Sequence, residues 1–194
     1  MNSSDSNALL IVISGPSGVG KTTITQQLVK RLDAKFSVSM TTRPMAGSDR
    51  EGEDYFFVDD ARFRQAIENR ELLEWAEVFG RWYGTPRQPV QEHLAGGRDV
   101  ILEIDVAGGK QVKSAYPQAL SIFFVPPSLE DLVDRLRGRG REDEQEIQRR
   151  YRDAKREIDE ARSSGAYDHF VENNDLKTAI EKSLALILKR KQEA

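Results

Sequence analysis

The sequence predicts an α/β fold in which helices cover both faces of a parallel sheet. Three observations support this. Residues 8–13 form a continuous apolar run, which is typical of a parallel strand buried on both faces. Residues 23–32 then place apolar side chains on one face of a helix. Similar strand patterns return at 99–105 and 120–125, each followed by a helical pattern.

A glycine-rich segment joins the first expected strand to the first expected helix. It begins at Gly15, reads Gly-Pro-Ser-Gly-Val-Gly-Lys-Thr, and matches the phosphate-binding pattern G-x-x-x-x-G-K-[ST]. Its glycines let successive backbone N–H groups turn toward phosphate oxygens, and the helix N-terminus adds a partial positive charge. We expect Lys21 to reach the β- and γ-phosphates of a nucleotide and the Thr22 hydroxyl to ligate its Mg²⁺. The pattern predicts a P-loop NTPase-type sheet whose nucleotide-binding residues, which the resemblance described below assigns to ATP, include Gly15, Pro16, Ser17, Gly18, Val19, Gly20, Lys21, Thr22 and Thr23.

Composition restricts the classes of partner. The net charge of −3 gives no electrostatic reason to expect nucleic acid or an anionic membrane as a partner. The chain has no cysteine, which excludes disulfides, thiolate metal sites and a cysteine nucleophile and is compatible with the cytoplasm. No apolar run approaches the roughly 18 residues that a membrane span needs. Residues 1–7 lack the features of a signal peptide and are expected to be a disordered lead-in.

The segment that follows the first helix breaks the alternation of strands and helices. Its short apolar stretches are separated by glycine, proline and aspartate, so we predict an inserted subdomain over 37–87. The expected elements are a strand at 36–40, a loop at 41–54, a strand at 55–58, a helix from Asp59 or Asp60 to 70, a strand at 72–79 and a turn at 80–84.

The second half of the chain returns to the α/β alternation. We predict helices at 86–94, 109–115, 128–137, 144–163 and 176–189, strands at 99–105, 120–125 and 169–172, and a mobile loop at 138–145. The expectation is therefore a single domain over 8–192. Its core would comprise 8–36, 88–137 and 164–192, and a mobile lid over 138–150 would lead into the long helix.

Seven segments, in order and at matching spacings, resemble guanylate kinase, a nucleoside monophosphate kinase family. The resemblance extends from about Leu9 to about Leu176, nearly the whole chain. Each segment alone is weak, but the ordered set is specific. The segments are FSVSMTTR at 36–43, DYFFV at 54–58, EWA at 74–76, WYGT at 82–85, LEID at 102–105, PPS at 126–128 and RGRG at 137–140.

The resemblance implies transfer of the γ-phosphoryl group of Mg²⁺-bound ATP to GMP, giving ADP and GDP; use of dGMP stays open. By position, the implied GMP-binding residues are Ser39, Arg43, Tyr55, Glu74, Tyr83, Thr85, Glu103 and Asp105. The implied catalytic residues are Lys21, Arg43, Arg139 and Arg150, and Arg135 and Asn173 are implied on the ATP side.

General chemistry agrees with these assignments. Guanine presents two neighbouring donors, N1–H and the 2-amino group, beside the O6 acceptor. A carboxylate such as Glu74 complements the donors, and a hydroxyl such as Ser39 complements O6. Adenine would leave Glu74 unpaired, which makes such a site selective. Phosphoryl transfer needs positive charge around the moving group, which arginines on a closing lid would supply. For Arg150 the alternative is a pair with Glu146 on a solvated helix.

The chain departs from the family pattern at one position. Three residues beyond Arg43 the family usually has a second phosphate-binding arginine, and this chain has Ala46. Arg50 either replaces it or lies in solvent. At the end of the strand at 99–105, either Asp105 or Glu103 would orient Mg²⁺-bound water or the GMP ribose and base, and the family pattern favours Asp105.

Two other functions are open at this stage. A related kinase could phosphorylate a sugar phosphate, although such a substrate does not need the donor and acceptor pattern of Ser39, Glu74 and Tyr83. A catalytically silent module of this family could bind protein partners, although it does not need an intact phosphate-binding motif. The oligomeric state is undetermined.

Overall fold

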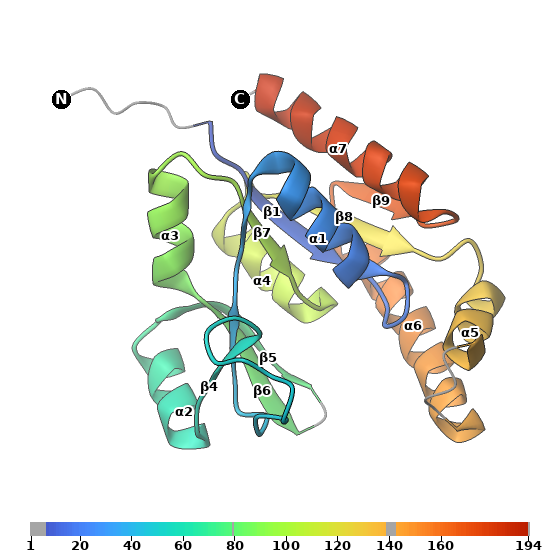
Figure 1. The fold of residues 1–194 in the computed structure, drawn as a ribbon, viewed down its shortest axis with the longest axis horizontal. Helices are drawn as coiled ribbons and strands as arrows, with labels where there is room; N and C mark the ends of the chain where they lie inside the picture. The colour runs from blue at the N-terminus through green and yellow to red at the C-terminus, as the bar shows by residue number, and fades with distance from the viewer. Residues whose placement is uncertain (1–6, 79, 139–142, 194) are drawn as a thin grey trace.

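Five parallel strands form the central sheet, in the order β2-β7-β1-β8-β9. The computed structural model describes residues 7–78, 80–138 and 143–193, which Figure 1 shows as a ribbon. The parallel sheet and its covering helices confirm the predicted α/β fold class. The strands are β1 (Leu10–Ser14), β2 (Lys35–Phe36), β7 (Val100–Glu103), β8 (Leu120–Val125) and β9 (His169–Glu172).

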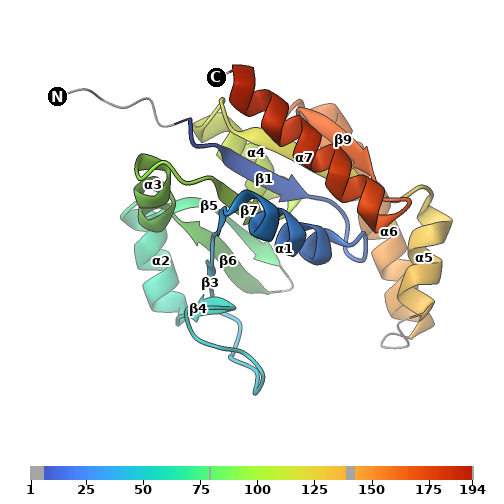
Figure 2. The ribbon, with the colours of Figure 1, turned by 45° about the horizontal axis from the view of Figure 1, so that its top comes forward.

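Helices pack on both faces of this sheet, as the two views in Figures 1 and 2 show. Successive side chains of a strand point to opposite faces, so β1 supplies both hydrophobic cores. Ile11 and Ile13 pack with one pair of helices, and Val12 packs with the helices of the other face. The first face carries α1 (Lys21–Leu32) and α7 (Leu176–Glu193), and the second carries α3 (Arg87–Ala95), α4 (Val106–Ala115) and α6 (Glu144–Ser164).

A second, four-stranded sheet lies beside the first and has the order β4-β3-β6-β5. Its small core comprises Met40, Phe63, Ala66 and Leu72 and lies beneath α2. Because this sheet has its own core, it forms a distinct layer next to the carboxyl ends of the central strands (Figure 2). The elements are β3 (Ser39–Thr41), β4 (Tyr55–Phe57), α2 (Asp60–Glu68), β5 (Leu72–Val78) and β6 (Arg81–Pro86).

Two predictions in this region are wrong. The single strand expected at 36–40 is two strands: β2 pairs with β7 in the central sheet, and β3 pairs with β4 and β6 in the second. The turn expected at 80–84 is mostly strand β6, which pairs antiparallel with β5. Gly84 suggested a turn, but a side chain there would meet Leu72, Phe63 and the Glu74 carbonyl, so glycine serves close packing within the sheet.

A third correction concerns the strand expected at 99–105. Strand β7 ends at Glu103, and α4 begins at Val106 rather than near residue 109. The Asp105 side chain caps α4 by accepting a hydrogen bond from the Gly108 N–H at 2.7 Å. This carboxylate therefore lies at a helix N-terminus at the edge of the sheet.

Helices α5 (Leu129–Gly138) and α6 pack against each other at the far end of the sheet. Ser128 caps α5 by accepting from the Asp131 N–H, and Asp143 caps α6 by accepting from the Glu146 N–H. Part of the predicted lid, residues 139–142, lies outside the described residues. None of the helices in the described ranges combines the length and apolar character needed to cross a membrane.

Candidate functional site

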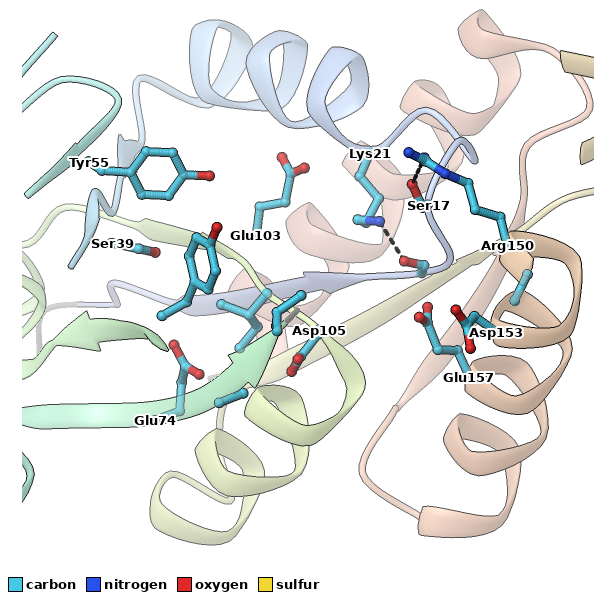
Figure 3. Close-up of a pocket in the computed structure, with 16 residues that line it drawn as sticks. Ser17, Lys21, Ser39, Tyr55, Glu74, Glu103, Asp105, Arg150, Asp153 and Glu157 are labelled. Carbon is cyan, nitrogen blue, oxygen red and sulfur yellow. Dashed lines mark hydrogen bonds between the residues drawn. The ribbon is translucent and has the colours of Figure 1, made fainter. Parts of the chain in front are cut away.

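One cavity of about 520 Å³ opens between the carboxyl ends of the central strands, the second sheet and α6. Parallel sheets commonly place ligands at this edge. Figure 3 shows the phosphate-binding loop on one side of the cavity and the residues of the second sheet on the other. The lining residues are Gly15, Ser17, Lys21, Ser39, Tyr55, Glu74, Ala76, Val78, Tyr83, Glu103, Ile104, Asp105, Arg150, Asp153, Ala154 and Glu157.

The phosphate-binding loop is held tightly against the sheet. Gly15 has a φ of +149°, and a Cβ atom there would lie 2.5 Å from the Phe124 carbonyl oxygen, so only glycine fits. Gly20 has a φ of +101° and precedes the first residue of α1. The loop therefore leads directly into the helix N-terminus that attracts phosphate.

Lys21 folds back over this loop. Its Nζ donates to the carbonyl oxygen of Gly15, as Figure 3 shows, and to that of Pro16 at 3.1 Å. Burial lowers the pKa of Lys21, while the nearby carboxylates of Glu103, Glu157 and Asp105 act in the opposite direction. The ammonium group is thus desolvated and surrounded by negative charge.

A hydroxyl and a carboxylate meet at the start of α1. The Thr22 Oγ1 donates to Glu103 Oε1 at 2.8 Å. Glu103 ends β7, and β7 pairs directly with β1, the strand before the loop. The sheet therefore places two hard oxygen ligands beside the phosphate-binding loop.

Glu74 is the buried carboxylate of the second sheet, with only 4% of its surface exposed. An irregularity in the β5–β6 pairing between Leu72 and Trp75 makes three consecutive residues of β5 buried and directs Glu74 to the cavity. Its Oε1 accepts a 2.6 Å hydrogen bond from the Thr85 hydroxyl. Burial raises the pKa of Glu74 to about 7, although the Thr85 bond opposes this shift.

Thr85 itself does not line the cavity. Its side chain is buried, and its hydroxyl is bonded to Glu74. Thr85 was predicted to contact the base or its edge, and the structure instead places it behind Glu74. It orients the carboxylate that faces the cavity.

Two tyrosines and an arginine form the outer part of this side. Tyr55 and Tyr83 line the cavity, with ring centroids 5.8 Å apart. The guanidinium of Arg43 lies over the Tyr55 ring at 5.2 Å, and its Nη2 pairs with Asp49 Oδ2 at 2.9 Å. Ser39, at the start of β3, lines the cavity near these rings (Figure 3).

Arg50 is placed differently. Its side chain is 68% exposed, does not line the cavity, and pairs with Glu53 at 2.6 Å and Asp54 at 3.8 Å. Of the two interpretations open from the sequence, the structure favours an arginine on the loop surface.

Helix α6 contributes more to the cavity than the sequence predicted. Arg150 donates from Nη1 to Ser17 Oγ at 2.8 Å, and its Nε lies 3.6 Å from Glu146. The pair with Glu146 that the sequence left open therefore occurs together with a contact to the phosphate-binding loop, which was not predicted. Asp153 and Glu157 line the same cavity and were not predicted (Figure 3). The missed signal is the spacing of 150, 153 and 157 on one helix face around the small residue Ala154.

Glu157 is largely removed from solvent. Burial raises its pKa to about 7, and Lys21 opposes the rise while Asp105 and Asp153 add to it. A carboxylate that titrates near neutrality and lines a cleft is a common feature of functional sites.

Asn173 and Arg135 do not line the cavity. Asn173 bonds to the phosphate-binding loop, and Arg135 bonds to Asn173. The Asn173 Nδ2 donates to the Val19 carbonyl at 2.7 Å, and Arg135 Nη2 donates to the Asn173 carbonyl at 2.8 Å. Asn173 is 5% exposed. The predicted catalytic residue Arg139 lies outside the described residues.

Comparisons with known proteins agree on one family. The family model described as guanylate kinase matches residues 7–191. Guanylate kinases from Bacillus cereus and Bacillus subtilis are each 46% identical to this chain over 182 residues, which is 93% of the chain and 87–88% of each relative. One from Synechocystis is 45% identical over 179 residues, 92% of both proteins.

A solved structure agrees with this result. The crystal structure of guanylate kinase from Anaplasma phagocytophilum matches with a TM-score of 0.76 and 30% identity, covering 95% of this chain and 86% of that one. The match of the family model to residues 7–191 and the identity to these relatives show that this chain belongs to the guanylate kinase family.

Proposed function

We propose that this chain transfers the γ-phosphoryl group of ATP to GMP, and that the cavity binds both nucleotides. The observation that carries the proposal is Glu74, a buried carboxylate that opens into the same cavity as Lys21 of the phosphate-binding loop. The part of the cavity around Glu74 suits a purine with adjacent donors, and the part around Lys21 suits a triphosphate.

Guanine recognition would depend on Glu74. Because Thr85 already donates to Oε1, the rest of the carboxylate is available to accept the N1–H and 2-amino donors of guanine. Ser39 lines the same side of the cavity and would supply a hydroxyl donor for the base. Adenine presents an acceptor where guanine has N1–H, so the Glu74 oxygen that Thr85 does not bond would be left without a donor, which is costly for a buried carboxylate.

The GMP phosphate would bind at Arg43, Tyr55 and Tyr83. Both tyrosines line the cavity, and the Arg43 guanidinium stacks on the ring of Tyr55. A guanidinium and two phenol groups are suitable donors for a phosphate.

The residues at the start of α1 fit Mg²⁺. Thr22 and Glu103 offer a hydroxyl and a carboxylate, and Mg²⁺ usually takes one or two such protein ligands together with phosphate oxygens and water. Within the described ranges, no group of three or more His, Cys, Asp or Glu side chains could hold a metal by itself, so phosphates would complete the shell. When bound, Mg²⁺ supplies charge neutralisation on the ATP phosphates.

This chain's own cations would act on the transferred group. Lys21 is desolvated, which strengthens its attraction to a phosphate oxygen, and Arg150 reaches the loop residue Ser17 from the opposite side. Arg139, by its position in the family pattern, would join them. Asp105 would orient the ribose or base of GMP from the N-terminus of α4, where Gly108 already holds it.

The test is a coupled assay of ADP formation with ATP and Mg²⁺, comparing GMP, dGMP, AMP, CMP, UMP and ribose 5-phosphate. We expect turnover with guanine nucleotides alone and loss of turnover when EDTA removes the metal. Turnover only with the sugar phosphate would reject guanine recognition by Glu74. Binding of ATP without turnover of any acceptor would favour a silent protein-binding module.

A further inference from the structure

Asp49 occupies the guanidinium that the proposed function assigns to the GMP phosphate. Its Oδ2 accepts from Arg43 Nη2 at 2.9 Å and from the Ala46 N–H at 2.7 Å. The Asp49 side chain is only 16% exposed and that of Arg43 only 30%. This ion pair is therefore partly shielded from water, where attraction between charges is stronger than at an open surface.

Other contacts fix where this pair lies. The Arg43 guanidinium sits over the rings of Tyr55 and Phe57, at 5.2 and 5.5 Å, and its Nη1 donates to the Pro44 carbonyl at 3.3 Å. Tyr55 also lines the cavity. Arg43 is thus held against Tyr55 without itself lining the cavity, and Asp49 lies on the donor edge of its guanidinium.

Carboxylates and phosphates bind a guanidinium through the same in-plane N–H groups. A phosphate that engages Arg43 through Nη2 meets the negative charge of Asp49 at the same atom. Neither of the two positions that could supply a second positive charge for the phosphate does so. Residue 46 is alanine, and Arg50 pairs with Glu53 and Asp54 on the loop surface. One guanidinium is therefore shared between two anions.

We propose that Asp49 competes with the phosphate of GMP for Arg43 and so weakens the affinity of this enzyme for its acceptor nucleotide. Asp49 is a positioning residue, since it acts through Arg43 and does not touch the reacting atoms. The inference rests on the proposed function, because it takes the phosphate of GMP as the ligand of Arg43.

Asp49→Asn is the informative variant because it removes the charge and keeps the loop. Asp49 also closes a tight turn, in which its own N–H donates to the Ala46 carbonyl at 2.9 Å. The amide oxygen of asparagine can still accept from the Ala46 N–H. We expect Asp49→Asn to lower the KM for GMP about three- to tenfold, the scale of removing one partly screened negative charge beside a phosphate.

Several readouts separate competition from a general effect on the fold. The kcat and the KM for ATP should stay within twofold of their original values, and so should the inhibition constant of guanosine, which lacks the phosphate. The gain should disappear in the Arg43→Gln background, since a double-mutant cycle reports coupling through Arg43.

The matched control is Glu51→Gln. Glu51 lies in the same loop and accepts from the Phe57 N–H at 3.1 Å, so this change also removes one negative charge from a backbone-bonded carboxylate. We expect a KM for GMP within twofold of the unchanged chain. An equal gain in both variants would reduce the effect to bulk charge and overturn the proposal.

The remaining outcomes are distinct. A raised or unchanged KM for GMP in Asp49→Asn, with normal turnover of GMP by the unchanged chain, would reject the competition while leaving the proposed function intact. Failure of the unchanged chain to bind or phosphorylate GMP would overturn both.

Discussion

Glu74 combines two requirements that oppose each other. Recognition of guanine by the proposed route needs the ionised carboxylate, whereas burial favours the protonated form and raises its pKa to about 7. The Thr85 hydroxyl offsets only part of this cost. A residue selected for function is in this way destabilising to the fold at neutral and alkaline pH.

Glu74→Gln should therefore stabilise the protein in a pH-dependent manner. A carboxyl group whose folded pKa lies above its unfolded value of 4.5 makes the folded state lose stability as the pH rises through about 7. The free energy of unfolding, measured in urea, should increase in the variant by about 2–3 kcal/mol more at pH 8 than at pH 5.

The control for this change lies in the same strand. Glu77 is exposed in β5, so Glu77→Gln should show no comparable pH-dependent gain. Glu74→Gln should also reduce kcat/KM for GMP about a hundredfold and leave the KM for ATP unchanged. Equal stabilisation at both pH values would contradict the assigned cost of burial.

Helix α4 connects the two sheets. Its capping residue Asp105 lines the cavity, and its Gln111 side chain bonds to both the N–H and the carbonyl of Trp75, at 3.2 and 2.8 Å. Between them, Gly108 faces Glu74, and a Cβ there would lie 2.5 Å from Glu74 Oε2. Because residue 108 has no side chain, the Glu74 carboxylate can lie against helix α4 at this point.

Gly108→Ala should separate helix stability from substrate binding. Alanine improves helix propensity by about 1 kcal/mol but must displace the buried carboxylate that Thr85 holds. We expect a KM for GMP raised at least tenfold, little change in the midpoint of thermal unfolding, and an unchanged KM for ATP. Gly138→Ala is the matched change, because no atom of the described residues, its own helix backbone aside, lies within 4 Å of a Cβ at that helical glycine, and it should leave the KM for GMP unaltered.

Helix α6 presents Arg150 to the phosphate-binding loop. Arg150→Gln removes a positive charge beside the phosphate-binding loop, where we propose that phosphoryl transfer takes place, so kcat should fall about a hundredfold or more while the KM for GMP changes little. Steady-state kinetics measure both constants. Arg152→Gln, at an exposed position of the same helix, should retain kcat, and an equal loss there would point to a general effect on α6.

The strand predictions were accurate where the sequence pattern shows how a strand is buried, and wrong where the result depends on which sheet the strand pairs with. Strand β8 matches its predicted bounds because its apolar run identifies a strand buried on both faces. Strand β9 also matches its predicted bounds, although it is a short strand in which only Val171 is fully buried. The alternation of apolar and polar residues at 36–40 does not show that β2 and β3 pair in different sheets, so the sequence predicts a single strand there. The acidic residues Asp153 and Glu157 were missed because charged side chains on a helix usually face water, and only the packed structure shows the cavity beside them.

Across the whole molecule, the cavity lies at the carboxyl ends of the central strands, and a clasp formed by Leu9, Asp99 and Lys191 lies at the opposite ends. Asp99, 4% exposed, accepts from the Leu9 N–H at 2.9 Å and pairs with Lys191 of α7 at 2.7 Å. The clasp joins the starts of β1 and β7 to the last helix. Stability and binding are thereby assigned to different ends of the sheet.

Lys191→Met should destabilise the fold without affecting activity. The change leaves the buried Asp99 carboxylate without its cationic partner, which typically costs about 3 kcal/mol in the free energy of unfolding. Urea denaturation measures this loss, and kcat/KM for both substrates should stay unchanged at 25 °C. Lys189→Met removes an exposed pair with Glu193 and should cost less than about 1 kcal/mol.

The site residues of the second sheet and the phosphate-binding loop were named from the sequence because their chemical types and spacings are distinctive. Their connections were not. The Thr85 bond to Glu74 and the Asp49 bond to Arg43 link residues 11 and 6 positions apart through side-chain orientation, which a linear pattern does not specify. The sequence therefore proposes residues where chemistry demands one type, and it does not give the contacts between them.

The support of the phosphate-binding loop has a consequence for how the protein is made. The motif starts at Gly15 and leaves the ribosome early, yet the Asn173 side chain that holds the Val19 carbonyl and the Arg150 side chain that reaches Ser17 are translated much later. A nascent chain carrying the complete motif lacks these braces until strand β9 has been synthesised. We therefore expect nascent chains that end before Asn173 to hold the motif less firmly than the finished chain.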